Sequence, residues 1–135
     1  MYQEIKNQFS DVPELKLKDL DARLKKGDLV FLDVRAEAER RVSIIPGALS
    51  VQEFEKQSLD SHKTVVVYCT IGYRSAKVVR KLKKKGIRAY NLEGSLLGWI
   101  HDGRPVVGPH GQNTKEVHVY GKSWNFLPQG FKGVW

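Results

Sequence analysis

The chain contains a single cysteine, Cys69, which lies where an apolar run ends and a basic, helix-forming run begins. The surrounding residues read VVVYCTIGYRSAKVVRKL, so the thiol is followed by a short glycine-containing loop that ends in Arg74 and Ser75. A thiol attacks as its thiolate, and an unperturbed cysteine, with a pKa of about 8.5, is mostly protonated at neutral pH. Nucleophilic chemistry at Cys69 therefore requires a loop that stabilises a sulfur anion.

Three features of this loop would stabilise such an anion. N–H groups at the start of the following helix have no intrahelical acceptor and carry partial positive charge. Gly72 can adopt backbone conformations that turn successive N–H groups inward as an anion-binding nest. Arg74 brings a full positive charge, which favours an ionised thiol nearby. We therefore interpret Cys69 as a reactive nucleophile rather than as a small buried hydrophobic residue.

The spacing between the cysteine and the arginine distinguishes two kinds of thiol chemistry. Four residues separate Cys69 from Arg74. Phosphatases that use a catalytic cysteine have one residue more between the two, which makes the loop wide enough to surround a phosphate. The shorter loop fits a bound sulfur atom better than a tetrahedral oxyanion. The spacing thus favours sulfur transfer, and a cysteine-dependent phosphatase or arsenate reductase is the disfavoured alternative.

The loop must be positioned by the elements around it, and most of these are short apolar strands. Such runs are rich in residues that favour strands and are separated by turn-forming residues. Predicted strands cover residues 29–34, 45–51 in part, 64–69 and 87–92. The runs are too continuous in apolar character for a sheet with one face in water, which indicates strands buried on both sides.

Helical patterns alternate with these strands. Leucines at helical spacing predict a helix over 17–26 that ends at Gly27. A second helix is predicted over 75–86, with Ser75 capping its start, and residues 52–57 are a weaker helix candidate. Strands that alternate with helices predict an α/β domain around a mostly parallel sheet.

In sheets of this kind, active sites gather at the carboxyl ends of the strands. Asp33 and Cys69 both lie at such ends in the predicted arrangement. Asp33 and Arg35 could shape the pocket, although we favour a structural ion pair or a loop tether for both. The four histidines show no spacing typical of metal ligands, so we predict no metal site.

With these motifs in this order, the chain resembles the rhodanese-like domain family, in its single-domain sulfurtransferase form. The resemblance depends on LDVR (32–35), IPGA (45–48), VVVYCTIGYRSA (65–76), NLEG (91–94) and GW followed by GRPV (98–106). It implies a three-layer fold in which helices flank a mostly parallel central sheet. The chain reads VSIIPGA where the family often has GHIPGA, and Gly94-Ser95 where a double glycine is usual. We expect neither departure to touch the cysteine loop.

The resemblance also implies a two-step sulfur transfer without a metal or an organic cofactor. The Cys69 thiolate would take a sulfane sulfur from thiosulfate or a persulfide, hold it as a cysteine persulfide, and pass it to a thiol or another nucleophilic acceptor. Loop amides would stabilise the persulfide, and Arg74 would orient an anionic donor. The residues implied in persulfide or substrate binding are Thr70, Ile71, Gly72, Tyr73, Arg74 and Ser75.

The overall charge gives a broader constraint on partners. The formal net charge is +8, which favours anionic partners. We expect a small anionic sulfur donor and a thiol or protein acceptor, and we disfavour nucleic acid as a partner. The predicted helix carries a basic face, which we interpret as solvated surface rather than as an RNA-binding or protein-binding site. Its residues are Lys77, Arg80, Lys81, Lys84 and Arg88.

The chain divides into a predicted rhodanese-like domain, 1–107, and a glycine-rich and aromatic extension, 108–135. We expect the extension to pack on the domain, with a small hairpin at 117–124. A non-catalytic binding or regulatory module that uses this extension is the alternative to an enzyme. We expect a cytoplasmic protein without membrane contact, because no apolar run could span a bilayer, no signal sequence is evident and one cysteine forms no internal disulfide.

Overall fold

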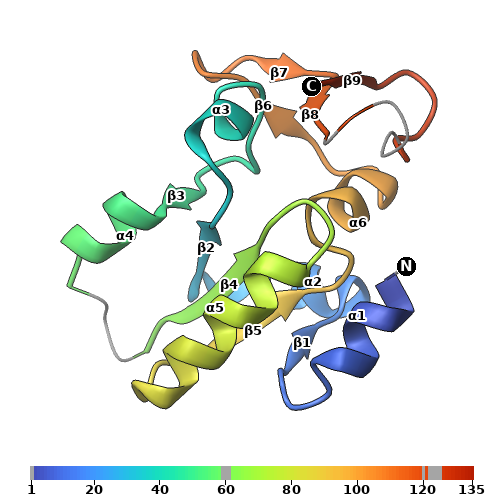
Figure 1. The fold of residues 1–135 in the computed structure, drawn as a ribbon. Coiled ribbons are helices and arrows are strands. Elements are labelled where there is room, and N and C mark those ends of the chain that lie inside the picture. Colours follow the sequence, from blue (N-terminus) through green and yellow to red (C-terminus); the bar gives the residue numbers. More distant parts are fainter. Residues whose placement is uncertain (1, 59–61, 120, 122–125) are drawn as a thin grey trace.

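A computed structural model describes residues 2–58, 62–119, 121 and 126–135. Its centre is a sheet of five parallel strands in the order β1-β5-β4-β2-β3 (Figure 1). The strands are β1 (Glu14–Leu15), β2 (Leu29–Asp33), β3 (Leu49–Ser50), β4 (Thr64–Tyr68) and β5 (Ala89–Leu92). The predicted α/β class is therefore confirmed, and β4, the strand that leads into the cysteine loop, lies in the middle of the sheet.

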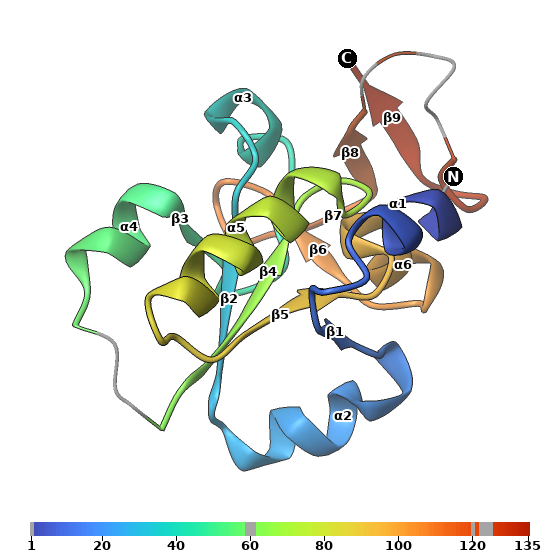
Figure 2. The same ribbon diagram turned by 60° about the horizontal axis from the view of Figure 1, so that its bottom comes forward.

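Helices cover both faces of this sheet, which makes three layers (Figure 2). They are α1 (Tyr2–Gln8), α2 (Leu17–Lys26), α3 (Glu37–Arg40), α4 (Val51–Lys56), α5 (Tyr73–Lys84) and α6 (Ser95–His101). One apolar cluster joins the sheet to α2 and α6, and a second joins it to α4 and α5. Within the described part of the chain, no helix has the length and apolar character needed to cross a membrane.

The apolar run of β4 supplies both clusters. Side chains alternate between the two faces of a strand. Val65 and Val67 accordingly pack with Val79 of α5, whereas Val66 and Tyr68 pack on the side of α6. All five residues are fully buried. Burial on both faces explains why this strand shows no alternation of apolar and polar residues.

The N-terminal helix α1 was not predicted from the sequence. Ile5 and Phe9 form a separate buried cluster with Ala76 of α5. The Phe9 ring also meets the ring of Tyr73 edge to face, with centroids 5.4 Å apart. Helix α1 therefore packs against the start of α5, directly beside the cysteine loop.

The segment after the sheet adds two small sheets. The antiparallel pair is β6 (Val106–Val107) with β7 (Asn113–Thr114), and the parallel pair is β8 (Glu116–His118) with β9 (Lys132–Val134). Val117 is buried in the cluster with α2 and α6, and Phe131 packs against it. Of the predicted hairpin at 117–124, residues 120 and 122–124 lie outside the described residues. Residues 117 and 118 lie in β8, which pairs with β9.

Candidate active site

The cysteine loop lies at the carboxyl edge of the sheet. Cys69 directly follows β4, whose last residue, Tyr68, is in register with Asp33 at the end of β2. Helix α5 then begins at Tyr73, after Gly72 in the left-handed region with φ of +110°. The parallel arrangement of β2 and β4 thus brings the two predicted strand-end residues to one edge of the sheet.

The predicted capping role of Ser75 is wrong. Gly72 occupies the N-cap position, and no side chain forms a capping hydrogen bond there. Ser75 instead lies in the first turn of α5, where it is fully buried and its hydroxyl is 3.4 Å from Cys69 Sγ. Because α5 begins two residues before Ser75, at Tyr73, the Ser75 hydroxyl contacts the Cys69 sulfur and does not cap the helix.

Cys69 has a polar environment although it is only 1% exposed. The Gly72 N–H donates to Cys69 Sγ at 3.1 Å. The N–H groups of Tyr73 and Ser75, in the first turn of α5, have no acceptor among the described residues. Such groups are the usual binding elements for an anion at a helix start. The loop therefore offers one donor to the sulfur itself and further donors to an anion beside it.

Gly72 provides a direct test of this geometry. In Gly72→Ala we expect a large loss of Cys69 reactivity towards iodoacetamide. The new Cβ would lie 3.3 Å from the Tyr2 ring, and alanine is strained at this φ by about 1–2 kcal/mol. The loop must shift to accommodate it, and the N–H donor to the sulfur shifts with it.

Gly86→Ala is the matched control, because Gly86 has φ of +80° and open space around its Cβ position. It should lower the thermal unfolding midpoint to a similar extent and leave the alkylation rate at Cys69 unchanged. Equal alkylation rates in the two variants would contradict a specific role for Gly72.

The structure places Arg74 in an ion pair that was not predicted from the sequence. Its guanidinium donates to both carboxylate oxygens of Glu39, at 2.8 and 2.9 Å, and to the Thr70 hydroxyl at 3.2 Å. Glu39 is buried in α3 and also accepts from the Ala36 N–H. Glu39 thus orients the arginine of the loop from another element. Nothing in the local sequence distinguishes this glutamate from the neighbouring Glu37.

Burial raises the pKa of Glu39, but the hydrogen bonds from Arg74 and Ala36 outweigh it, and the net pKa lies below the ordinary value of 4.5. The folded state therefore binds fewer protons here than the unfolded chain does. Ionised Glu39 stabilises the fold above pH 4.5, and this contribution is lost as the pH falls through the lowered pKa.

We therefore expect Glu39→Gln to reduce the free energy of unfolding at pH 7, with a difference from the wild type that shrinks below pH 4.5. Urea unfolding at several pH values measures this difference. Glu37→Gln is the control, because the Glu37 carboxylate pairs with Arg41 on the exposed surface, and it should show no such trend. A Glu39→Gln difference that is constant between pH 7 and pH 3 would contradict the prediction.

Asp33 and Arg35 form a fully buried ion pair behind the loop. Asp33 accepts from the Arg35 side chain at 3.0 and 2.8 Å and from the Tyr68 hydroxyl at 2.8 Å. Arg35 also donates to the Ser43 carbonyl, and the Tyr68 hydroxyl accepts from the Ile45 N–H. Burial lowers the pKa of Arg35, but the bonds and charge of Asp33 outweigh it and raise the pKa above its ordinary value. The pair joins β2 and β4 to the segment before β3.

Ser95 contacts the cysteine loop, which corrects the expectation that the Gly94-Ser95 departure lies away from it. The Cys69 N–H donates to Ser95 Oγ at 3.2 Å, and Ser95 Oγ is 3.3 Å from Ser75 Oγ. The start of α6 also holds the loop, since the Leu96 N–H donates to the Cys69 carbonyl at 3.0 Å. The segment after β5 therefore supports the cysteine loop through hydrogen bonds to the Cys69 main chain.

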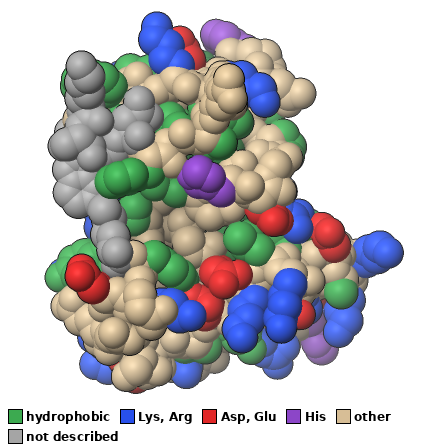
Figure 3. Space-filling model, turned by 90° about the vertical axis from the view of Figure 1, so that its right-hand side faces the viewer, with side chains coloured by type: hydrophobic (Ala, Val, Ile, Leu, Met, Phe, Trp, Pro, Cys, Tyr) green, Lys and Arg blue, Asp and Glu red, His purple; other side chains and the backbone are tan. Residues whose placement is uncertain are grey.

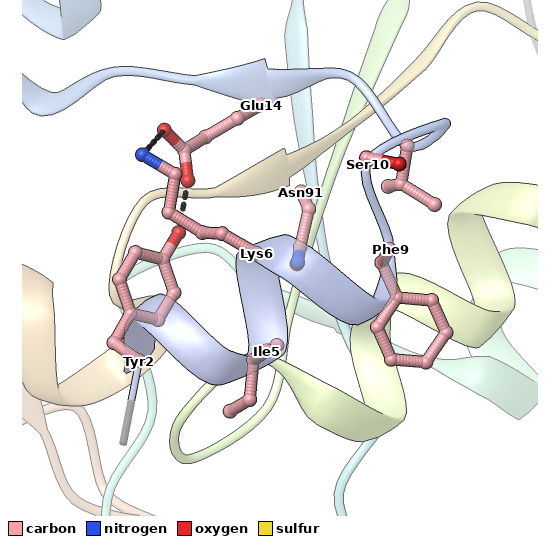
Figure 4. Close-up of a pocket in the computed structure, with 8 residues that line it drawn as sticks. Tyr2, Ile5, Lys6, Phe9, Ser10, Glu14 and Asn91 are labelled. Atoms are coloured by element: carbon pink, nitrogen blue, oxygen red, sulfur yellow. Dashed lines mark hydrogen bonds and ion pairs between the residues drawn. The ribbon is translucent and has the colours of Figure 1, made fainter.

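Tyr2 of α1 lines two pockets. A pocket of about 150 Å³ separates α1 from β1 and β5, and in Figure 4 Tyr2 and Lys6 of α1 point to Glu14 across it, while Asn91 enters from β5. A more apolar pocket of about 300 Å³ adjoins the loop at Ile71. Its lining residues are Tyr2, Ile71, Gly94, Leu97, Gly98, His101 and Phe126. Figure 3 shows the side of the molecule that lies on the right in Figure 1, with several hydrophobic side chains near its middle.

The remaining predicted residues lie on the outer face of α5 and beyond it. Arg80 forms an ion pair with Asp11, and Lys77 lies over the Tyr73 ring with its amine 4.5 Å from the centroid. Lys81, Lys84 and Arg88 are exposed. His, Cys, Asp and Glu side chains form no cluster suited to a metal ion within the described ranges.

Comparisons with known proteins show which proteins the chain is similar to. The rhodanese-like domain matches residues 16–102. A sulfurtransferase of Allochromatium vinosum is 31% identical over 106 residues, which cover 74% of this chain and 99% of the relative. A tRNA sulfurtransferase of Desulfurococcus amylolyticus is 39% identical over 70 residues, which cover 52% of this chain and 14% of the relative.

Among solved structures, thiosulfate sulfurtransferase from Pseudomonas aeruginosa superposes with a TM-score of 0.67 at 25% identity. The match covers 82% of this chain and 22% of that protein. The chain thus spans nearly the whole of the Allochromatium relative but only a small part of the other two proteins. Helix α1 lies outside the matched family region, and it packs against α5 and Ile71 of the cysteine loop.

Proposed function

The chain belongs to the rhodanese-like domain family, as the motifs in its sequence indicated, and on this premise we propose that it is a sulfurtransferase that carries sulfane sulfur as a persulfide on Cys69. The observation that supports the proposal best is the hydrogen bond from the Gly72 N–H to Cys69 Sγ. It places the single thiol of the chain in contact with a main-chain donor, at the start of a helix where the Tyr73 and Ser75 N–H groups have no acceptor among the described residues.

The first step is the attack of the Cys69 thiolate on the outer sulfur of thiosulfate. The new S–S bond forms as the S–S bond of thiosulfate breaks, sulfite leaves with its electron pair, and the enzyme keeps an anionic persulfide. In the second step, a thiolate or cyanide attacks the terminal sulfur of that persulfide. The acceptor leaves as a persulfide or as thiocyanate, and the Cys69 thiolate is regenerated.

The surroundings of Cys69 suit an anionic intermediate of this size. The free N–H groups of Tyr73 and Ser75 would donate to the terminal sulfur without reorganisation. Arg74, oriented by Glu39, would attract the sulfonate of the donor from the rim of the loop. The net charge of +8 adds a long-range attraction for anionic donors.

The test is a single-turnover experiment on the purified chain. Incubation with thiosulfate should add about 32 Da to the protein, the mass of one sulfur atom carried as a covalent intermediate. Cyanide should remove this mass and release one equivalent of thiocyanate. Absence of the adduct with thiosulfate, with an organic persulfide and with polysulfide would overturn the proposal. Hydrolysis of an aryl phosphate in place of sulfur transfer would favour the phosphatase alternative.

A further inference from the structure

Cys69 is the start and the end of a closed circuit of hydrogen bonds. The Cys69 N–H donates to Ser95 Oγ (3.2 Å), which is 3.3 Å from Ser75 Oγ. Ser75 Oγ donates to Asn91 Oδ1 (2.7 Å), and Asn91 Nδ2 donates to the Gly72 carbonyl (3.1 Å). The Gly72 N–H donates back to Cys69 Sγ (3.1 Å). All five residues are buried, and Asn91 also lines the pocket between α1 and the sheet.

We propose that Ser95 is a positioning residue for Cys69. The Ser95 hydroxyl completes this ring of hydrogen bonds and thereby determines which groups donate to the Cys69 sulfur. The backbone supports a role for the side chain. Ser95 has φ of +52° and is the one non-glycine residue in the described chain with a positive φ. A glycine would adopt this conformation without strain. The turn itself therefore does not require a serine, whereas the contacts of the hydroxyl do.

The directions of the bonds follow from counting protons. The Asn91 amide must present its amino group to the Gly72 carbonyl, which accepts only, so its oxygen faces Ser75. Ser75 has one hydroxyl proton, and it is committed to that oxygen. The Ser75 oxygen is thus an acceptor for the Ser95 hydroxyl and for the Cys69 thiol.

Ionisation of the sulfur changes this arrangement. When the thiol loses its proton to solvent, Ser75 can donate to the sulfur only by turning its hydroxyl away from Asn91. The Ser95 hydroxyl keeps donating to the Ser75 oxygen in both states, and this polarises the Ser75 hydroxyl as a donor. Ser95 therefore favours the ionised sulfur through Ser75, without touching the sulfur itself.

Alkylation of Cys69 by iodoacetamide measures this effect, and the chain has no other cysteine to interfere. In Ser95→Gly and Ser95→Ala, we expect the pH profile of alkylation to move to higher pH and the rate at pH 7 to fall about fivefold, as for one lost hydrogen bond. The glycine relaxes the backbone and the alanine does not, so a loss shared by both identifies the hydroxyl. Ser43→Ala is the control, because Ser43 is a buried serine whose hydroxyl has no partner within the described residues.

A second comparison tests the route through Ser75. In a Ser75→Ala background, Ser95→Gly should have little further effect on the profile, because the link through which it acts is already absent. Profiles of Ser95→Gly and Ser95→Ala that superimpose on the wild type would overturn the inference, as would an undiminished effect of Ser95→Gly in the Ser75→Ala background.

The inference rests on the proposed function only for its relevance to the persulfide. Alkylation is measured without any sulfur donor, so its result does not depend on sulfur transfer. If the protein forms no sulfur adduct but the Ser95 variants show shifted alkylation profiles, the proposed sulfur transfer is refuted and the positioning role of Ser95 is supported. If the protein forms the adduct but the variant profiles are not shifted, the positioning role of Ser95 is refuted and sulfur transfer is supported.

Discussion

Replacement of Cys69 by serine is expected to reduce sulfur transfer from thiosulfate to cyanide to the uncatalysed background. A serine oxygen forms no stable bond to a sulfane sulfur, so the covalent intermediate is lost and no slower version of the same route remains. The substitution changes one atom in a buried site that already contacts two hydroxyls and an amide. We therefore expect the fold to be retained, with a circular dichroism spectrum like that of the wild type.

Thiocyanate production and intact mass together measure this prediction. The wild type should gain about 32 Da with thiosulfate, and Cys69→Ser should gain nothing under the same conditions. The control is the wild type blocked by iodoacetamide, which keeps every other residue and should be equally inactive. Residual turnover in a folded Cys69→Ser protein would show that another group carries the reaction.

The largest effect on stability is expected from Asp33→Ala. Removal of this carboxylate leaves the Arg35 guanidinium buried without its counter-ion and the Tyr68 hydroxyl without its acceptor. Loss of one partner of a buried ion pair costs about 3–5 kcal/mol, because the remaining charge is uncompensated. This is a large share of the stability of a domain of this size. Urea unfolding followed by tryptophan fluorescence should show a strongly lowered midpoint or an unfolded protein.

Asp11→Ala is the matched control for this prediction. Asp11 also accepts two hydrogen bonds from an arginine, Arg80, but both side chains are well exposed. Ion pairs in water contribute little, so the urea midpoint should barely change. Should the two variants lose stability equally, the buried pair at Asp33 would not be the structural tether that its geometry indicates.

The short-range features of this molecule could be predicted from its sequence. The helix over 17–26 was predicted with its end at Gly27, and the structure has α2 over the same residues with Gly27 in the left-handed conformation. The strand leading to Cys69 was also predicted, because a run such as TVVVY tolerates burial on both faces. These features depend on side chains a few residues apart, whose effects are expressed within one element.

Two predictions from the sequence, on the start of α5 and on the N-terminal segment, were wrong or incomplete. In both places the local sequence allows two structures, and packing against other elements decides between them. Ser75 has the residue type of a helix cap, but the helix begins earlier because Gly72 supplies the left-handed turn there. Helix α1 was missed because a helix of seven residues is marginal by itself. It is stable here because Ile5 and Phe9 pack against α5.

By itself, the sequence determined the α/β class, the family and the position of the one thiol between a central strand and a helix. Only the tertiary structure brought Glu39 to Arg74, and Ser95 and Asn91 to Ser75, to complete the surroundings of Cys69. These partners are 16 to 35 residues apart in the chain. Their contacts form because parallel strands deliver distant segments to one edge of a sheet, and no periodicity within a single element encodes which polar side chains meet there.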